Sequence, residues 1–135
     1  MEASLLVLAA SALGDANAAA TQPAKSQSSK VAVLLKKPLA GVEGKEVTLV
    51  AVDYPPGTAS ARHRHPGPVF GYVAEGAVVF QIDNGPLTTY RKGETFYEEP
   101  GHVHTVSRNA SATEPARIIA FMVAEKGAAV ATPVD

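Results

Sequence analysis

The apolar residues between positions 31 and 125 occur in short runs that are rich in Val, Ile, Phe and Tyr, and Gly or Pro separates each run from the next. This spacing is typical of strands joined by turns. No segment in this region has the apolar period of a long amphipathic helix. The runs therefore predict nine short strands, at residues 31–36, 45–54, 59–65, 69–74, 77–83, 87–91, 95–99, 103–108 and 116–124.

Turn-forming residues fill the gaps between these runs. Gly or Pro occurs at 55–57, 66–68, 92–93 and 100–101. Asn84-Gly85 favours a tight two-residue turn and predicts a hairpin between Val78 and Tyr90. Nine short antiparallel strands in 135 residues predict one all-β domain, a sandwich or barrel of the double-sheet jelly-roll kind. We expect this domain to occupy residues 31–126.

The two ends of the chain differ from this domain. Residues 4–13 are apolar and precede a small-residue stretch at 16–20 with an Ala-x-Ala pattern, which is typical of a signal peptide over 1–20. Glu2 stands where such a peptide has a positive charge, so an N-terminal helix packed on the domain is the alternative. We expect a flexible tether at 21–30, a frayed tail at 127–135, and a periplasmic or secreted protein.

Charge and cysteine content exclude several classes of function. The formal net charge of −1 provides no field to collect nucleic acid, and no apolar run reaches the length of about 18 residues that a membrane span needs. The absence of cysteine excludes disulfides, thiolate catalysis and cysteine-ligated metals. Any bound metal must therefore be held by histidine and carboxylate side chains.

The four histidines form two His-x-His pairs, His63 with His65 and His102 with His104. Residues i and i+2 of a strand face the same side, so His63 and His65 would point away from Arg64. Two imidazoles from one strand and a third from a neighbouring strand can hold Fe, Mn, Ni or Zn and leave positions open for water or substrate. The alternative is a set of surface histidines at the edges of loops.

The first histidine pair lies in a segment that resembles the first motif of the cupin family, G-x5-H-x-H-x3,4-E-x6-G. Gly57, His63, His65 and Gly76 fit this motif in register. Its metal-binding glutamate is missing, because Val69 and Phe70 occupy the two positions where the motif allows it.

The second pair lies in a segment that resembles the second cupin motif, G-x5-P-x-G-x2-H-x3-N. Gly93, Gly101 and His104 match it, whereas Pro100 is displaced by one position and Asn109 arrives one residue late. The resemblance implies a cupin barrel with a divalent transition metal on His63, His65 and His104. Three-histidine iron sites occur among cupin relatives such as cysteine dioxygenase.

The missing glutamate leaves three alternatives: a three-histidine site, a site with a substitute carboxylate, or a cupin without metal. If His104 faces the interior, the hairpin before it could bring Glu98 beside it, as a ligand or as a catalytic base. An exposed charge at the end of a strand is the other interpretation of Glu98. His102 adjoins the Pro-Gly turn, and we expect it at the mouth of the pocket rather than among the ligands.

Two functions follow from this constellation. The first is a metal-dependent oxygenase or isomerase acting on a small oxygen-rich molecule, and the second is a non-catalytic module that binds or senses a small ligand. An inert structural cupin is a third interpretation. The fold hosts many activities, so the site must decide between them. The apolar strand at 31–36 would be exposed at a sheet edge, which predicts a homodimer built on it.

Overall fold

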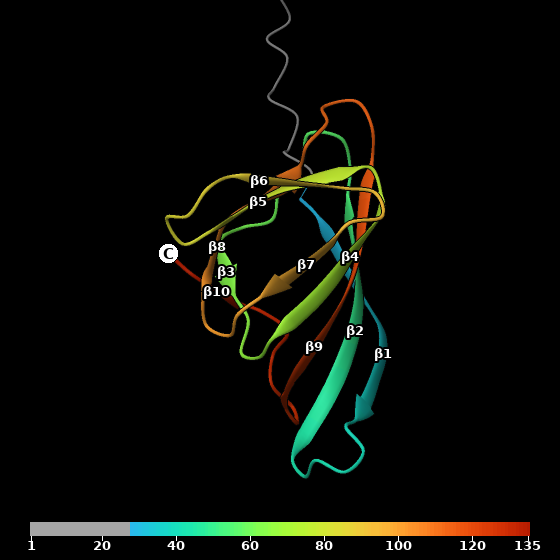
Figure 1. The fold of residues 1–135 in the computed structure, drawn as a ribbon, viewed down its shortest axis with the longest axis vertical. Coiled ribbons are helices and arrows are strands. Elements are labelled where there is room, and N and C mark those ends of the chain that lie inside the picture. Colours follow the sequence, from blue (N-terminus) through green and yellow to red (C-terminus); the bar gives the residue numbers. More distant parts are fainter. Residues whose placement is uncertain (1–27) are drawn as a thin grey trace, which may run out of the picture.

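The protein is described by a computed structural model that covers residues 28–135 (Figure 1). The predicted signal peptide at 1–20 and most of the predicted tether lie outside the described residues. Within 28–135 the chain forms ten strands and no helix, so no described helix could cross a membrane. The strands are β1 (Lys30–Pro38), β2 (Lys45–Tyr54), β3 (His63–Arg64), β4 (Val69–Glu75), β5 (Ala77–Ile82), β6 (Thr88–Arg91), β7 (Thr95–Glu98), β8 (Val103–Asn109), β9 (Ala116–Glu125) and β10 (Thr132–Pro133).

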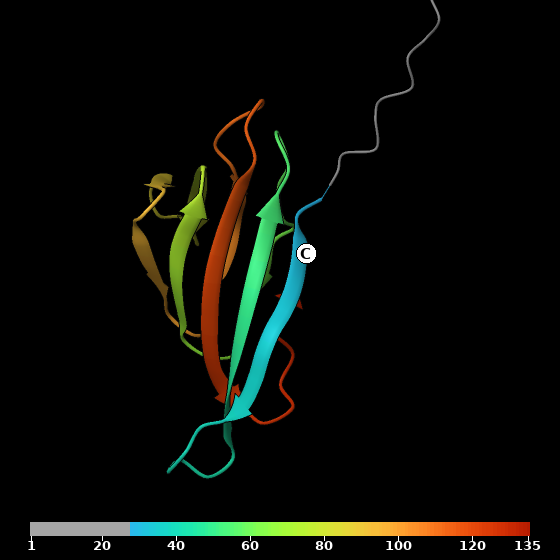
Figure 2. The same ribbon diagram turned by 90° about the vertical axis from the view of Figure 1, so that its right-hand side faces the viewer.

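The strands form two antiparallel five-stranded sheets. One has the order β1-β2-β9-β4-β7, and the other has the order β10-β3-β8-β5-β6. Figure 2 shows the first sheet from its outer side, with β1 at its edge. Consecutive strands alternate between the two sheets along much of the chain. This arrangement confirms the predicted all-β, double-sheet jelly-roll fold.

Alternation along the strands of the first sheet builds its half of the core. In β9, every second residue from Ala116 to Ala124 is buried, while Arg117, Phe121 and Glu125 are exposed. β2 pairs with β9 over its whole length, from Lys45 opposite Glu125 to Tyr54 opposite Ala116. Since directly paired residues face the same side, the buried rows of the two strands form one continuous, mainly apolar wall, with Glu46 and Thr48 as its polar members.

Gly71 in β4 makes room for an aromatic ring on this wall. It pairs with Phe96 of β7 and faces the same side. A Cβ atom at Gly71 would lie only 1.9 Å from Cζ of Phe96. A glycine inside a strand often marks such a close approach, and here it allows Phe96 to lie flat against the sheet.

The structure differs from the sequence expectations at two places in the second sheet. The run at 59–65 forms regular strand pairing only in β3, because residues before it contact β8 through isolated bonds such as Ser60 N–H to the Ser107 carbonyl oxygen at 2.8 Å. The tail at 127–135, which we expected to fray, contains β10 and pairs with β3. The Val134 amide also donates to the Arg62 carbonyl oxygen. The tail is thus held by backbone hydrogen bonds to the edge of β3 that does not face β8.

Candidate metal centre

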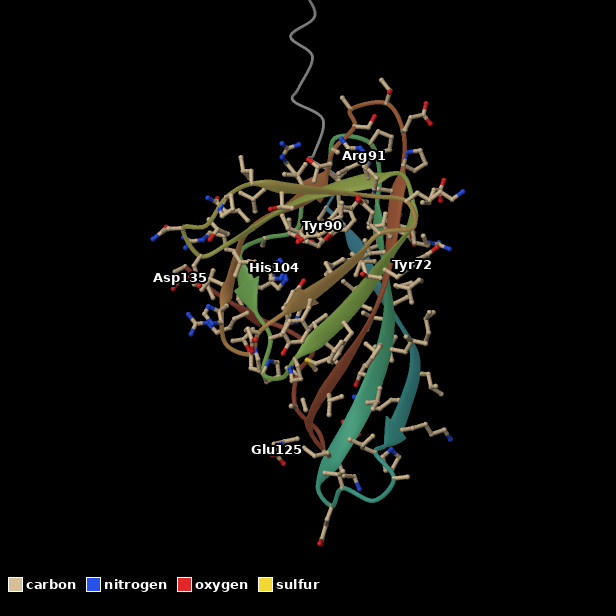
Figure 3. The ribbon with its side chains drawn as sticks, in the orientation of Figure 1. Tyr72, Tyr90, Arg91, His104, Glu125 and Asp135 are labelled. Carbon is tan, nitrogen blue, oxygen red and sulfur yellow. The ribbon has the colours of Figure 1, made fainter. Side chains whose placement is uncertain are left out.

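Three histidines converge between the two sheets. His63 in β3 pairs directly with His104 in β8, and His65 follows β3 by one residue. Each offers one nitrogen, and these nitrogens all lie within 4.8 Å of one another. The rings of His63 and His104 are stacked, with centroids 4.8 Å apart, and the His65 ring stands nearly perpendicular to both. Figure 3 labels His104, whose buried side chain lies between the sheets.

Backbone carbonyls set the tautomer of two of these imidazoles. The Nδ1 of His63 lies 2.7 Å from the Ala61 oxygen, and the Nδ1 of His65 lies 2.6 Å from the Val130 oxygen. A carbonyl oxygen can only accept, so Nδ1–H is the donor in both and Nε2 keeps its lone pair. Hydrogen bonds of this kind orient histidines that bind metals through their other nitrogen.

Glu98 at the end of β7 supplies a carboxylate to the same place. Its Oε2 lies 2.6 Å from Nε2 of His104 and 3.3 Å from Nε2 of His65. The residue is only 6% exposed, which excludes the interpretation of Glu98 as a solvated strand end. Glu98 pairs directly with Val69 across β4 and β7. Val69 occupies one of the two positions where the motif allows its glutamate, so the carboxylate here comes from the neighbouring strand and faces the same side as Val69.

The short distance between Glu98 and His104 is not a well-directed hydrogen bond. Both His104 nitrogens and Glu98 Oε2 are buried without a hydrogen-bond partner of suitable geometry in the described structure. Two ligand atoms at right angles around an ion with bonds of about 2.0–2.1 Å lie about 3 Å apart. The His104 nitrogen and the Glu98 oxygen thus lie close together without a hydrogen bond between them. This arrangement is better explained by two ligands of one divalent metal than by a simple ion pair.

Burial favours the charge state that metal binding needs. The pKa of His63 lies below its usual value, chiefly because burial disfavours the imidazolium form. A neutral imidazole is the form that binds a metal. The donor set of imidazole nitrogens and one carboxylate suits Fe, Mn, Ni or Zn.

His102 lies away from this cluster. Its Nδ1 pairs with Oδ2 of Asp83 at 2.5 Å, and both side chains are about half exposed. This hydrogen bond holds the pKa of Asp83 below its usual value. His102 does not line the cavity, so it is neither a candidate ligand nor a residue at the mouth of the pocket.

The cluster opens into a cavity of about 290 Å³ between the sheets. Its walls are mainly apolar, with contributions from Val50, Val52, Phe80, Phe96, Ile118 and Met122. The segment after Glu125 closes one side, where Val130 and Ala131 line the cavity. An apolar pocket with a few convergent polar groups is the usual form of a small-molecule site.

A chain of hydroxyl groups on the cavity wall was not predicted from the sequence. The buried hydroxyl of Tyr54 lies 2.9 Å from that of Ser107 and accepts a bond from Ser60 at 3.2 Å. Ser107 is three residues after His104, so strict alternation would turn it outward. A β-bulge in the pairing of β5 with β8, between the partners of Gln81 and Ile82, turns both residues inward.

Comparison with known proteins agrees with this architecture. A sequence profile of the Cupin domain family matches residues 50–123, more than half of the chain. A cupin-like protein from Thermotoga maritima is 23% identical with a TM-score of 0.63, and the match covers 78% of this chain and 75% of that one. An uncharacterized conserved protein with a double-stranded beta-helix domain from Klebsiella pneumoniae is 26% identical with a TM-score of 0.60. This match covers 82% of this chain and 90% of that one.

A DMSP lyase from Ruegeria pomeroyi shares the fold at 18% identity and a TM-score of 0.58, over 65% of this chain and 43% of that one. No curated protein matches the sequence significantly. The matched region contains His63, His65, Glu98 and His104, and the two sheets have the arrangement that the resemblance implied. The chain belongs to the cupin family.

Proposed function

We propose that this protein is a metal-dependent enzyme, an oxygenase or isomerase, that acts on a small oxygen-rich molecule. His63, His65 and His104 would hold a divalent transition metal, with Glu98 as the fourth ligand. The observation that carries this proposal is the convergence of three histidine nitrogens with a carboxylate oxygen on the wall of the cavity, where the atoms of His104 and Glu98 are buried without a hydrogen-bond partner in the described structure. A metal bound there with open positions would act as a Lewis acid toward a chelating substrate or, if redox-active, support dioxygen chemistry.

The chain's own residues prepare the site for such a substrate. The carbonyls of Ala61 and Val130 orient two imidazoles, and apolar side chains form most of the cavity wall. Glu98 has a second possible role, because a carboxylate at this place could instead accept a proton from a bound substrate. Its contacts with two Nε2 atoms favour the role of ligand.

A non-catalytic ligand-binding module is the second candidate. If Glu98 is bound to metal, the cavity walls offer only hydroxyl groups for proton transfer within residues 28–135. A binding protein needs no further acid or base. Turnover of any chelating substrate by the metal-loaded protein would show that the protein is an enzyme rather than a binding module.

Metal analysis of protein purified without a histidine tag tests the site itself. We expect near-stoichiometric metal in the wild type and loss of it in His63→Ala, His65→Ala and His104→Ala, since each variant removes one ligand. His102→Ala is the matched control and should retain full occupancy. Full retention of metal in a His63→Ala/His65→Ala double variant would overturn the proposal.

Glu98→Gln separates the two roles of the carboxylate. As a ligand, its loss should lower metal content. As a base, its loss should lower turnover while metal is retained. If neither quantity changes, Glu98 has no part in the site.

We further propose that the protein is exported and works as a homodimer. An apolar segment followed by an Ala-x-Ala pattern supports export, and N-terminal sequencing of the protein from its native host tests it. The dimer is supported by β1, an edge strand with all nine residues exposed.

A further inference from the structure

We infer that the cavity selects a chelating ligand with no more than one negative charge, an apolar body and a neutral oxygen remote from the metal, and that Tyr54 and Ser107 bind this oxygen. The inference rests on the proposed metal site and names the class of molecule that the site accepts. Two independent observations support it. One is the charge of the cavity, and the other is the arrangement of hydroxyl groups on its wall.

The charge of the metal centre favours a single negative charge on the ligand. Glu98 contributes one negative charge, and the three imidazoles are neutral when they bind a metal. A divalent ion therefore leaves a net charge of +1, which one anionic group on the ligand neutralises. A second anionic group would leave excess negative charge in a largely apolar cavity.

Among the described residues, no cationic side chain on the cavity wall is available to neutralise such a second charge. Within residues 28–135, neither Lys nor Arg lines the cavity. The remaining groups on its walls are aliphatic, aromatic or hydroxyl-bearing. An unpaired charge buried in such surroundings is strongly disfavoured, so dicarboxylates and phosphorylated molecules should be excluded.

The hydroxyl pair supplies a donor for a neutral oxygen. Tyr54 comes from β2 and Ser107 from β8, so the pair bridges the two sheets inside the cavity. Both residues are buried, at 2% and 4% exposure. Burial raises the pKa of Tyr54, so its phenol keeps the proton at neutral pH.

The direction of the hydrogen bonds leaves one proton of the pair free. Ser60 donates to the Tyr54 oxygen, and a single bond joins Tyr54 to Ser107. If Tyr54 donates in that bond, the Ser107 proton has no acceptor among the described side chains. If Ser107 donates, the Tyr54 proton has none. In both cases one O–H can donate to an acceptor oxygen of a ligand, such as a hydroxyl or carbonyl.

The chain of hydroxyls continues along the cavity wall to Ser60 and Ser29. Ser60 lies 2.6 Å from Ser29 through their hydroxyl oxygens, just before β1. Ser60 therefore donates to the Tyr54 hydroxyl, and Ser29 in turn contacts Ser60. This support fixes the phenol in place before a ligand arrives, which is the arrangement expected of a specificity group.

Three pyranone chelators that differ in one substituent test the inference. Allomaltol, kojic acid and comenic acid share a singly anionic hydroxypyranone chelating group, and carry at carbon 2 a methyl, a hydroxymethyl and a carboxylate group, respectively. The protein is loaded with zinc, its zinc content is measured, and binding is followed by isothermal titration calorimetry. We expect kojic acid to bind about fivefold more tightly than allomaltol, and comenate at least about tenfold more weakly than kojic acid.

Variants assign the preference to the hydroxyl pair. Tyr54→Phe and Ser107→Ala should each weaken the binding of kojic acid, because the remaining hydroxyl loses the partner that positions it. The double variant, which removes both hydroxyls, should reduce the affinity for kojic acid to that for allomaltol, and all three variants should leave allomaltol affinity and zinc content unchanged. Tyr72→Phe, on the exposed outer face, is the matched control and should behave as the wild type. Ser107→Ala keeps the test valid if Tyr54→Phe does not fold.

The outcomes separate this inference from the proposed function. Protein that holds no zinc overturns both. Stoichiometric zinc with comenate bound as tightly as kojic acid overturns the charge argument. Equal affinities for kojic acid and allomaltol, or no binding of any pyranone, would overturn the role of Tyr54 and Ser107.

Discussion

At the scale of single residues, the candidate site has its carboxylate on a different strand from the one that the cupin motif implies. The first cupin motif places it in β4, where this chain has Val69, and here Glu98 of β7 stands directly opposite on the same face. The paired side chains of adjacent strands lie close enough to replace one another. The pairing of β4 with β7 therefore explains how the motif can lose its glutamate while the site keeps a carboxylate.

This explanation predicts that the carboxylate can be moved back. Glu98→Val should lose metal, and the double variant Val69→Glu/Glu98→Val should regain a substantial part of it, because the second carboxylate reaches the site from the opposite position. Metal content after dialysis measures both. Val69→Gln/Glu98→Val is the matched control, since it has the same size without the charge. Equal metal content in the two double variants would contradict the explanation.

A second prediction at this scale concerns Gly71. Substitution by Ala would place a methyl group against the Phe96 ring, 1.9 Å from Cζ, and the ring or the strand must shift. We expect Gly71→Ala to lower the free energy of unfolding by about 1–3 kcal/mol, measured by urea denaturation. Phe96→Leu should relieve this cost in the double variant by about 1 kcal/mol or more. Strictly additive losses would show that the ring does not require the glycine.

At the scale of strands, the sequence predicts the elements whose side chains carry the pattern. β2 has the predicted bounds, and the other main strands differ from the predicted runs by a few residues at most, because alternation and turn residues mark them. The His-x-His spacing likewise predicts the histidine cluster. β10 and the bulge in β8 could not be predicted in this way. β10 forms through backbone pairing with β3, and the bulge in β8 results from its register with β5.

The tail gives a prediction that sequence alone does not suggest. Its Val130 oxygen accepts the Nδ1–H of His65, so the tail orients a proposed metal ligand. Deletion of residues 128–135 should weaken zinc binding about 10–100-fold, the usual effect of losing such an orienting partner. Competition with a chromophoric chelator measures this affinity.

A shorter deletion is the control for the tail. Removal of residues 132–135 deletes β10 but keeps Val130, and we expect a much smaller loss of zinc affinity. Circular dichroism should show the same sheet content in both variants. If the two deletions weaken zinc binding equally, pairing of β10, rather than the Val130 oxygen, orients His65.

At the scale of the whole molecule, the first sheet ends in an apolar strand with no neighbour on its far side within residues 28–135. Val31 and Val33 of β1 pair with Val52 and Val50 of β2, yet they are 60% and 54% exposed whereas their partners are buried. Long apolar edge strands tend to pair with other strands, and proteins commonly protect them by charge or by association. β1 carries Lys at 30, 36 and 37 but none in its apolar centre.

We expect this edge to be covered by β1 of a second copy, related by a two-fold axis, because antiparallel pairing of identical strands satisfies both free edges at once. One chain of the full sequence has a mass of 14.0 kDa, and light scattering should return twice the mass of the chain that is measured. Val33→Lys should shift the protein toward monomer, since it places a charge in the interface. Leu87→Lys, at a similarly exposed apolar residue just before β6, should leave the mass unchanged. A monomer mass for the wild type at high concentration would show that β1 remains a free edge, protected by its flanking lysines alone.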